Sequence, residues 1–216
     1  MVTIVGFGSL LSEKSARSTF GDAMTNFRLA RMRNYRRVFA HPGSIFFERG
    51  IANLATKEIS SLSVEPAEGR SFLISVFDLP ESMLPDFYER EEEYRIVSAD
   101  FEELDGTPGG QGLMCTRWTD EEYIQHRGQE TFDRLYKRHG VDTIWGWDEH
   151  SGILPCRVYL RHCLLSVKKL GDMVYEDFVQ SSFLGDRKTT IKEYITANPS
   201  IMKELPPAHL SERYNG

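Results

Sequence analysis

The chain has 216 residues, a net charge of −6 and a pI near 5.6. This length suits one domain with a sizeable core, and the acidic balance gives no electrostatic reason to expect a nucleic-acid partner. No apolar run approaches the roughly 18–20 residues that a membrane span needs, and the N-terminus lacks the features of a signal peptide. We therefore expect no membrane partner. The three cysteines are an odd number and lie far apart, so we expect reduced thiols and a cytoplasmic location.

The N-terminal half predicts strands separated by short helices and turns. Residues 2–5 (Val-Thr-Ile-Val) form an apolar run that stops at Gly6, which is typical of a buried strand. Residues 72–79 are the clearest strand because they are rich in β-branched and aromatic side chains. Pro80 can open a helix. Further predicted elements are a strand or its leading loop within 29–39, a helix over 81–89 and a strand over 94–101.

The C-terminal half predicts more helix than strand. Thr119 and Glu122 fit a capping box, so a helix should begin there and run to about His139. Asp172 is a candidate cap for another helix, and Thr190 begins a short one. The remaining predictions are a glycine-rich turn at 105–112, strands at 142–147 and 156–165, and an extended tail from Pro206.

This mixture has no steady alternation of strand and helix and contains no internal repeat. Such an order favours the α+β class, with a small barrel-like mixed sheet surrounded by helices. The pattern does not determine the topology.

A loop with two glycines follows the first predicted strand. Gly6 and Gly8 flank Phe7, so the backbone can turn tightly and expose consecutive N–H groups, which makes an anion-binding concavity. Leu11 stands where a dinucleotide fingerprint needs a small residue, and Ser9 is not centred in a nucleophile-elbow motif. An ordinary strand-end turn is the alternative interpretation.

A run of charged residues, Glu89-Arg-Glu-Glu-Glu93, lies between the predicted helix and the next strand. Most such runs are solvated helix ends. This one lies beside buried elements and at a helix C-terminus, where the helix dipole disfavours anions. A local rule that is broken without evident gain indicates a functional site.

Metal and thiol chemistry receive little support. The six histidines show no ligand spacing, and His162, Cys163 and Cys156 match no zinc pattern, so we expect no metal. A cysteine hydrolase acting through Cys115, Cys156 or Cys163 would need folding to bring a histidine to the thiol.

Taken together, these motifs resemble the γ-glutamylcyclotransferase family, with its ChaC-type glutathione-degrading and plant AIG2-like relatives. Gly6-Phe-Gly-Ser-Leu10 resembles the Tyr-Gly-Ser-Leu/Asn loop that opens these proteins. Asn34-Tyr-Arg-Arg-Val-Phe39 resembles their Gly-Tyr-Arg-Arg-x-Phe stretch. Leu79-Pro80, a helix and an acidic run ending in Tyr94-Arg95 resemble the segment with the catalytic glutamate, and Cys156-Arg-Val-Tyr159 resembles a late core strand.

The resemblance implies a cofactor-free enzyme of glutathione metabolism, a transferase or lyase that releases 5-oxoproline from a γ-glutamyl amide or peptide. Because Arg90-Glu91 matches an Arg-Glu pair of ChaC-like members, Glu91 is the expected general acid/base and Glu92 the fallback. The family domain would span residues 1–170, with a helical extension, 171–216, packed on it. The expected substrate-binding residues are Gly6, Phe7, Gly8, Ser9, Leu10, Arg36, Tyr94 and Tyr159.

Two departures leave a second interpretation open. Phe7 replaces a common tyrosine of the family, and Glu92 replaces the glycine that usually follows the catalytic glutamate. A catalytically inactive small-ligand-binding or interaction protein on the same fold is therefore the alternative. Tyr94, Tyr159 and Arg36 also have plain structural readings, as packed or ion-paired side chains. The particular γ-glutamyl substrate and the oligomeric state do not follow from the sequence.

Overall fold

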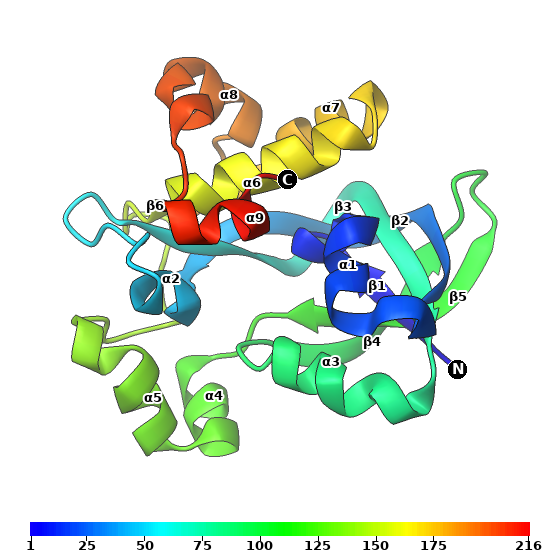
Figure 1. Ribbon diagram of the computed structural model, residues 1–216, viewed down its shortest axis with the longest axis horizontal. Helices are drawn as coiled ribbons and strands as arrows, with labels where there is room; N and C mark the ends of the chain where they lie inside the picture. The colour runs from blue at the N-terminus through cyan, green and yellow to red at the C-terminus, as the bar shows by residue number, and fades with distance from the viewer.

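A computed structural model describes all residues, 1–216. Seven strands form one sheet in the order β6-β3-β1-β5-β4-β2-β7, and an additional pairing of β2 with β3 closes five of them into a barrel (Figure 1). Strands β1 and β5 run parallel, whereas the other barrel pairs are antiparallel. The strands are β1 (Val2–Gly6), β2 (Thr25–Pro42), β3 (Glu58–Leu79), β4 (Arg95–Glu102), β5 (Pro108–Thr116), β6 (Leu154–Pro155) and β7 (Ser182–Leu184).

The two longest strands, β2 and β3, serve two parts of the sheet. Their register shifts between Arg33 and Tyr35, where Asn34 adopts a φ of 59° and its side-chain oxygen accepts a hydrogen bond from Gly69 N at 3.1 Å. Asparagine tolerates this left-handed conformation better than most residues, so the strand can bend there. On one side of the bend the strands belong to the barrel. On the other side they form a ribbon that β6 and β7 extend in parallel.

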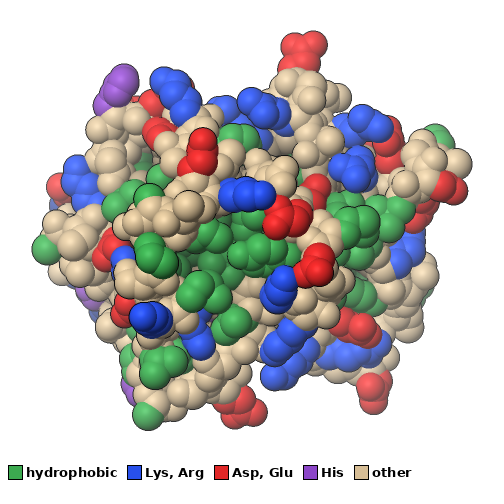
Figure 2. Space-filling view, turned by 90° about the horizontal axis from the view of Figure 1, so that it is seen from above, with side chains coloured by type: hydrophobic (Ala, Val, Ile, Leu, Met, Phe, Trp, Pro, Cys, Tyr) green, Lys and Arg blue, Asp and Glu red, His purple; other side chains and the backbone are tan.

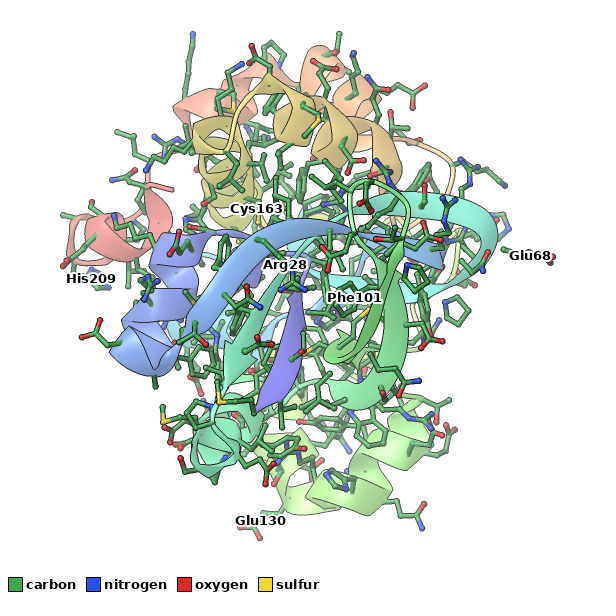
Figure 3. The ribbon with its side chains drawn as sticks, turned by 90° about the vertical axis from the view of Figure 1, so that its right-hand side faces the viewer. Arg28, Glu68, Phe101, Glu130, Cys163 and His209 are labelled. Carbon is green, nitrogen blue, oxygen red and sulfur yellow. The ribbon has the colours of Figure 1, made fainter.

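Helices cover the barrel from two directions (Figures 1 and 3). The longest, α6, packs against α7, and α7 packs on β3. Helices α4 and α5 lie on the opposite side of the barrel and carry Glu130 (Figure 3). The helices are α1 (Glu13–Phe20), α2 (Ser44–Glu48), α3 (Leu84–Arg90), α4 (Asp120–Arg127), α5 (Gln129–Leu135), α6 (Arg157–Lys169), α7 (Asp172–Ser181), α8 (Ile191–Ala197) and α9 (Ser211–Tyr214).

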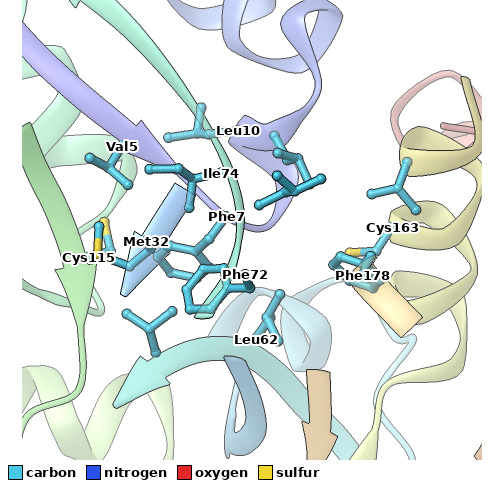
Figure 4. Close-up of a cluster of buried hydrophobic side chains, with 14 of the residues drawn as sticks. Val5, Phe7, Leu10, Met32, Leu62, Phe72, Ile74, Cys115, Cys163 and Phe178 are labelled. Atoms are coloured by element: carbon cyan, nitrogen blue, oxygen red, sulfur yellow. The ribbon is translucent and has the colours of Figure 1, made fainter. Parts of the chain in front are cut away.

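The core has a large and a small part. The main core fills the barrel and continues under α6 and α7, and Figure 4 shows Phe7, Phe72 and Met32 close together within it. The small core lies under α4 and α5 around Tyr136, which is completely buried. Arg37 is also completely buried and donates to Asp177 (2.8 Å) and Ser181 (2.7 Å) of α7, so it joins the ribbon to the helical layer.

The α+β class and the mixed barrel with surrounding helices are confirmed. The capping box predicted at Thr119 is present, and the short helix predicted to begin at Thr190 is α8, which also starts with a capping box. The single helix expected from Thr119 to His139 is wrong, because Gly128, with a φ of 88°, separates α4 from α5.

Three further predictions are corrected by the structure. Residues 156–165 form most of α6 instead of a strand, and residues 142–147 form no strand either. The tail is not simply extended, because it contains α9. The segment 171–216 contains α7, α8 and α9 and also contributes β7, which pairs with β2. None of the helices combines the length and the apolar character needed to cross a membrane.

Candidate active site

The loop after β1 folds back on β3. A Cβ atom at Gly6 would lie 2.5 Å from Ser75 Oγ and 2.6 Å from the Leu10 carbonyl oxygen, so only glycine fits there. Ser75 Oγ donates to the Leu10 oxygen at 2.8 Å and holds this conformation. The backbone N–H groups of Phe7 and Gly8 donate to no other group of the chain. The loop therefore offers free donors to a bound anion or carbonyl.

Glu91 lies at the C-terminal end of α3, where its N–H caps the helix by donating to Phe87 O at 3.0 Å. Its side chain is only 14% exposed. Arg90 Nε donates to Glu91 Oε1 at 2.9 Å. Arg90 thus fixes the position of the Glu91 carboxylate.

The same guanidinium group reaches the glycine loop and α1. It donates to Ser9 Oγ at 3.3 Å and to Ser15 Oγ at 3.4 Å, and it also bonds Thr19. Arg90 therefore links the carboxylate, the loop and α1 in one polar network.

A small pocket with a cavity volume of about 30 Å³ lies between the loop and Glu91. It contains eight of the residues expected from the sequence and three that were not expected. The expected ones are Gly6, Phe7, Gly8, Ser9, Leu10, Glu91, Tyr94 and Tyr159, and the others are Val5, Leu62 and Cys115.

Two expected site residues do not line this pocket. Glu92 is exposed to solvent next to Glu91. Arg36 forms an ion pair with Glu65 at 2.6 Å, on the ribbon of β2 and β3.

The two tyrosines contribute differently to the pocket. Tyr94 donates its hydroxyl to Leu62 O at 3.0 Å, so this hydroxyl is engaged with the backbone. Tyr159 projects from α6, and a Cβ at Gly8 would lie 3.2 Å from its hydroxyl oxygen. Burial raises the pKa of both phenols well above the ordinary value. Both are therefore neutral hydrogen-bonding groups at physiological pH.

Phe7 packs its ring into the core and is 6% exposed. Figure 4 shows this ring beside Phe72. A tyrosine in the same orientation would bury its hydroxyl among apolar side chains, which costs free energy unless a partner is present.

Glu93 has a role that sequence reasoning missed. It accepts hydrogen bonds from Ser44 N at 2.6 Å and from the Tyr136 hydroxyl at 2.8 Å. Burial raises the pKa of Glu93, although these hydrogen bonds oppose the shift. Glu93 therefore connects the end of the acidic run to the start of α2 and to the small core. No local sequence signal distinguishes Glu93 from Glu91 and Glu92.

His41 is fully buried behind Tyr94. Its ring stacks on Trp145, with centroids 4.4 Å apart, and meets Tyr94 edge-on at 5.2 Å. Burial, together with the positive charge of Arg117, lowers the pKa of His41 to about 3. His41 is therefore a neutral packing group.

Thiol and metal chemistry find no matching geometry. All three cysteines are buried free thiols, and burial raises the pKa of Cys156 and of Cys163 to about 12. Burial, and then the charge of Glu91, raises the pKa of Cys115 as well. No hydrogen bond joins a cysteine to a histidine, since Cys156 donates to Ile51 O and His162 accepts from Gly216. No group of three or more His, Cys, Asp or Glu side chains is arranged to hold a metal ion.

Comparison with known proteins gives similarities of structure. No protein-family model matches the sequence, and no curated protein matches it. A solved γ-glutamyl cyclotransferase is similar, with a TM-score of 0.42 and 12% identity over 62% of this chain and 85% of that one. An uncharacterized protein from Homo sapiens is similar, with a TM-score of 0.42 and 14% identity over the same shares of each chain. An AIG2-like protein from Mus musculus has a TM-score of 0.35 and 18% identity over 56% of this chain and 82% of that one.

Proposed function

We propose that the chain is a γ-glutamylcyclotransferase-type enzyme that releases 5-oxoproline from a γ-glutamyl amide or peptide. The observation that carries this proposal is the position of Glu91. Its carboxylate lines the same small pocket as the loop whose Phe7 and Gly8 N–H groups are free. A general base and a set of hydrogen-bond donors around one cavity are what an intramolecular acyl transfer needs.

In the proposed reaction, Glu91 takes a proton from the α-amine of the substrate. The amine nitrogen attacks the γ-carbonyl carbon, the C–N bond to the leaving amine breaks, and Glu91 returns the proton to that amine. The products are 5-oxoproline and the free amine, and no cofactor takes part. The loop N–H groups would hold the anionic oxygens of the substrate.

The other pocket residues have supporting roles in this proposal. Tyr159 would donate a hydrogen bond to the substrate, because its hydroxyl lies beside Gly8 and burial keeps it protonated. Arg90 would keep the Glu91 carboxylate directed at the pocket. We also propose that residues 171–216 are an extension to a family domain of residues 1–170.

One observation favours a second candidate, an inactive binding protein on the same fold. The Arg90 guanidinium contacts Glu91 at 2.9 Å, so this carboxylate already has a hydrogen-bonded partner within the chain.

The test is 5-oxoproline release from a panel of γ-glutamyl peptides and amides by wild type, Glu91→Gln and Glu92→Gln. Glu92 is the matched control, since it is adjacent and exposed. Release that is lost only in Glu91→Gln supports the enzyme and its base. Absence of release from every substrate would refute the enzymatic function and leave the binding protein.

A further inference from the structure

Four charged side chains from separate parts of the chain meet on the ribbon of β2 and β3. Arg36 and Glu65 lie directly opposite each other in the register of these strands, so their side chains share one face of the ribbon. Arg36 Nη2 lies 2.6 Å from Glu65 Oε1. Arg117 Nη1 lies 3.6 Å from Glu65 Oε2, and Arg187 Nε lies 3.4 Å from Oε1. One carboxylate therefore holds three guanidinium groups, and we call these four residues the arginine cluster.

Two of these arginines are also fixed by backbone carbonyl groups. Arg117 follows β5, and its guanidinium donates to the carbonyl oxygens of Trp118, at 3.3 Å, and Trp145. Arg187 lies in the turn after β7 and donates to the carbonyl oxygen of Trp147 at 3.1 Å. A site whose donors are already held in place loses less conformational entropy when a ligand binds. The arginine cluster is thus pre-organised.

The charges of the arginine cluster do not balance. None of its arginines pairs with a second carboxylate, so three guanidinium groups and one carboxylate leave an excess of two positive charges. Acidic residues of the adjoining turns are engaged elsewhere. Asp148 and Asp186 accept hydrogen bonds from backbone N–H groups of their own turns, and Glu149 pairs with Lys188 at 3.1 Å.

The arginine cluster has a donor available on its exposed side. The side chains of Arg36 and Arg117 are 27% and 36% exposed, whereas those of the other two members are each 9% exposed. Arg36 contacts Glu65 through Nε and Nη2, which leaves Nη1 for another partner. A ligand can therefore reach the arginine cluster from solvent.

The tryptophans that hold Arg117 add to the excess of donors. The indole N–H groups of Trp118 and Trp145 are buried and have no acceptor within the chain. Elsewhere on the surface, charges of both signs are mixed: on the face seen from above, basic and acidic side chains border a central group of apolar ones (Figure 2). In a chain whose net charge is −6, a local excess of donors and positive charge indicates a site for an anion.

We propose that the arginine cluster binds a phosphate dianion, either free phosphate or the phosphate group of a small-molecule monoester. A guanidinium group binds two phosphate oxygens with parallel hydrogen bonds. A dianion neutralises the excess of two positive charges, whereas a single carboxylate leaves one. The site is separate from the Glu91 pocket, because no member of the arginine cluster lines that pocket, and it does not depend on the proposed function.

Calorimetry on the full chain at pH 8 tests this site, because a phosphate monoester has its second pKa at about 6 and is a dianion there. Titrations with inorganic phosphate, glycerol phosphate and acetate are compared at constant ionic strength. We expect at least one of the two phosphate ligands to bind roughly tenfold more tightly than acetate, which offers one charge and two oxygens. Equal affinity for the two phosphate ligands identifies the phosphate group alone as the ligand, and a preference for one of them identifies its source.

Variants locate the bound phosphate. Arg36→Gln or Arg117→Gln should weaken phosphate binding about three- to tenfold, and Arg36→Lys, which keeps the charge, should lose less. Arg33→Gln is the matched control, since Arg33 is an arginine of the same strand that is 57% exposed and paired with its own carboxylate, Glu102, at 2.6 Å. It should leave the affinity for phosphate unchanged.

Thermal unfolding without phosphate checks that each variant folds, and the comparison of phosphate with acetate on wild type depends on no variant. Absence of phosphate binding, equal affinity for phosphate and acetate, or an affinity that Arg36→Gln and Arg117→Gln leave unchanged would overturn the inference. An equal loss in Arg33→Gln and Arg36→Gln would also overturn it, because the effect would then be that of net charge alone.

Discussion

The close approach of the glycine loop to β3 makes a quantitative prediction for Gly6→Ala. The added methyl carbon would lie 2.5 Å from Ser75 Oγ, 2.6 Å from the Leu10 oxygen and 2.7 Å from the Leu10 carbonyl carbon. Two of these atoms belong to the backbone, so the loop itself must move. Overpacking of this kind costs about 1–3 kcal/mol. For a domain of this size, each kcal/mol lowers the Tm by about 2–4 °C, which gives a decrease of about 2–12 °C.

Thermal unfolding of wild type, Gly6→Ala, Ser75→Ala and the double variant measures this effect. Ser75→Ala alone should cost about 1 kcal/mol, because the Leu10 carbonyl loses its donor. The double variant should recover only part of the stability lost in Gly6→Ala, since the contacts with the Leu10 backbone remain. A Tm for Gly6→Ala within about 1 °C of wild type would refute the close approach of the loop. Full recovery in the double variant would mean that the Ser75 hydroxyl alone excludes a larger residue.

Three further predictions concern side chains around the site. Burial raises the pKa of Glu93, so the folded state binds the carboxyl proton of Glu93 more tightly than the unfolded state does. The contribution of Glu93 to wild-type stability should therefore fall as the pH rises above about 4.3, the usual pKa of a free glutamate. The stability advantage of wild type over Glu93→Gln should therefore shrink between pH 4 and pH 8 in thermal unfolding, and an advantage that grows with pH would contradict this assignment. Tyr94→Phe removes the donor to Leu62 O and should lower the unfolding free energy by about 1 kcal/mol, measured by denaturant titration, whereas an unchanged value would show that this bond contributes nothing. Arg37→Met removes the ion-pair partner of Asp177 and should lower the unfolding free energy by about 3–5 kcal/mol in the same titration. Adding Asp177→Leu should recover most of this loss. No recovery would argue against the loss of the ion pair as the cause.

The sequence predicted those features that depend on local residues. The strand that ends at Gly6, the capping box at Thr119 and the helix start at Thr190 each depend on a few neighbouring residues, and all three were found. Glu91, the base that the family resemblance implies, lines the same pocket as the loop, and its catalytic role stays a prediction. The strand and the two helix starts are each determined by a short segment. Glu91 and the loop were expected to face each other only because their motifs resemble those of the γ-glutamylcyclotransferase family.

The errors occurred where tertiary packing decides the outcome. Residues 156–165 contain Val158 and Tyr159 within an apolar run, and such a short run does not distinguish a strand from a buried helix. In the structure most of α6 is buried, including Leu160 and Leu164. Its polar stripe is narrow, and only Arg157 and Arg161, spaced i and i+4, fall within residues 156–165, which is too sparse a signal to outweigh the apolar run.

The unexpected pocket residues illustrate the same limit. Leu62 and Cys115 come from β3 and β5, and only the pairing of strands brings them to the loop. The separate roles of three neighbouring glutamates have a similar origin. Glu91 lines the pocket, Glu92 faces solvent and Glu93 accepts bonds from Ser44 and Tyr136, because the chain turns between α3 and β4.

The central claim is that Glu91 is the general acid/base of a γ-glutamylcyclotransferase-type reaction. The most direct test is kcat/KM for 5-oxoproline release from γ-glutamylalanine by wild type, Glu91→Gln and Glu92→Gln, with folding of each variant checked by thermal unfolding. We predict a loss of about 10²–10⁴-fold for Glu91→Gln and a change of less than about twofold for Glu92→Gln. Equal activity of wild type and Glu91→Gln, or a loss confined to Glu92→Gln, would contradict the account.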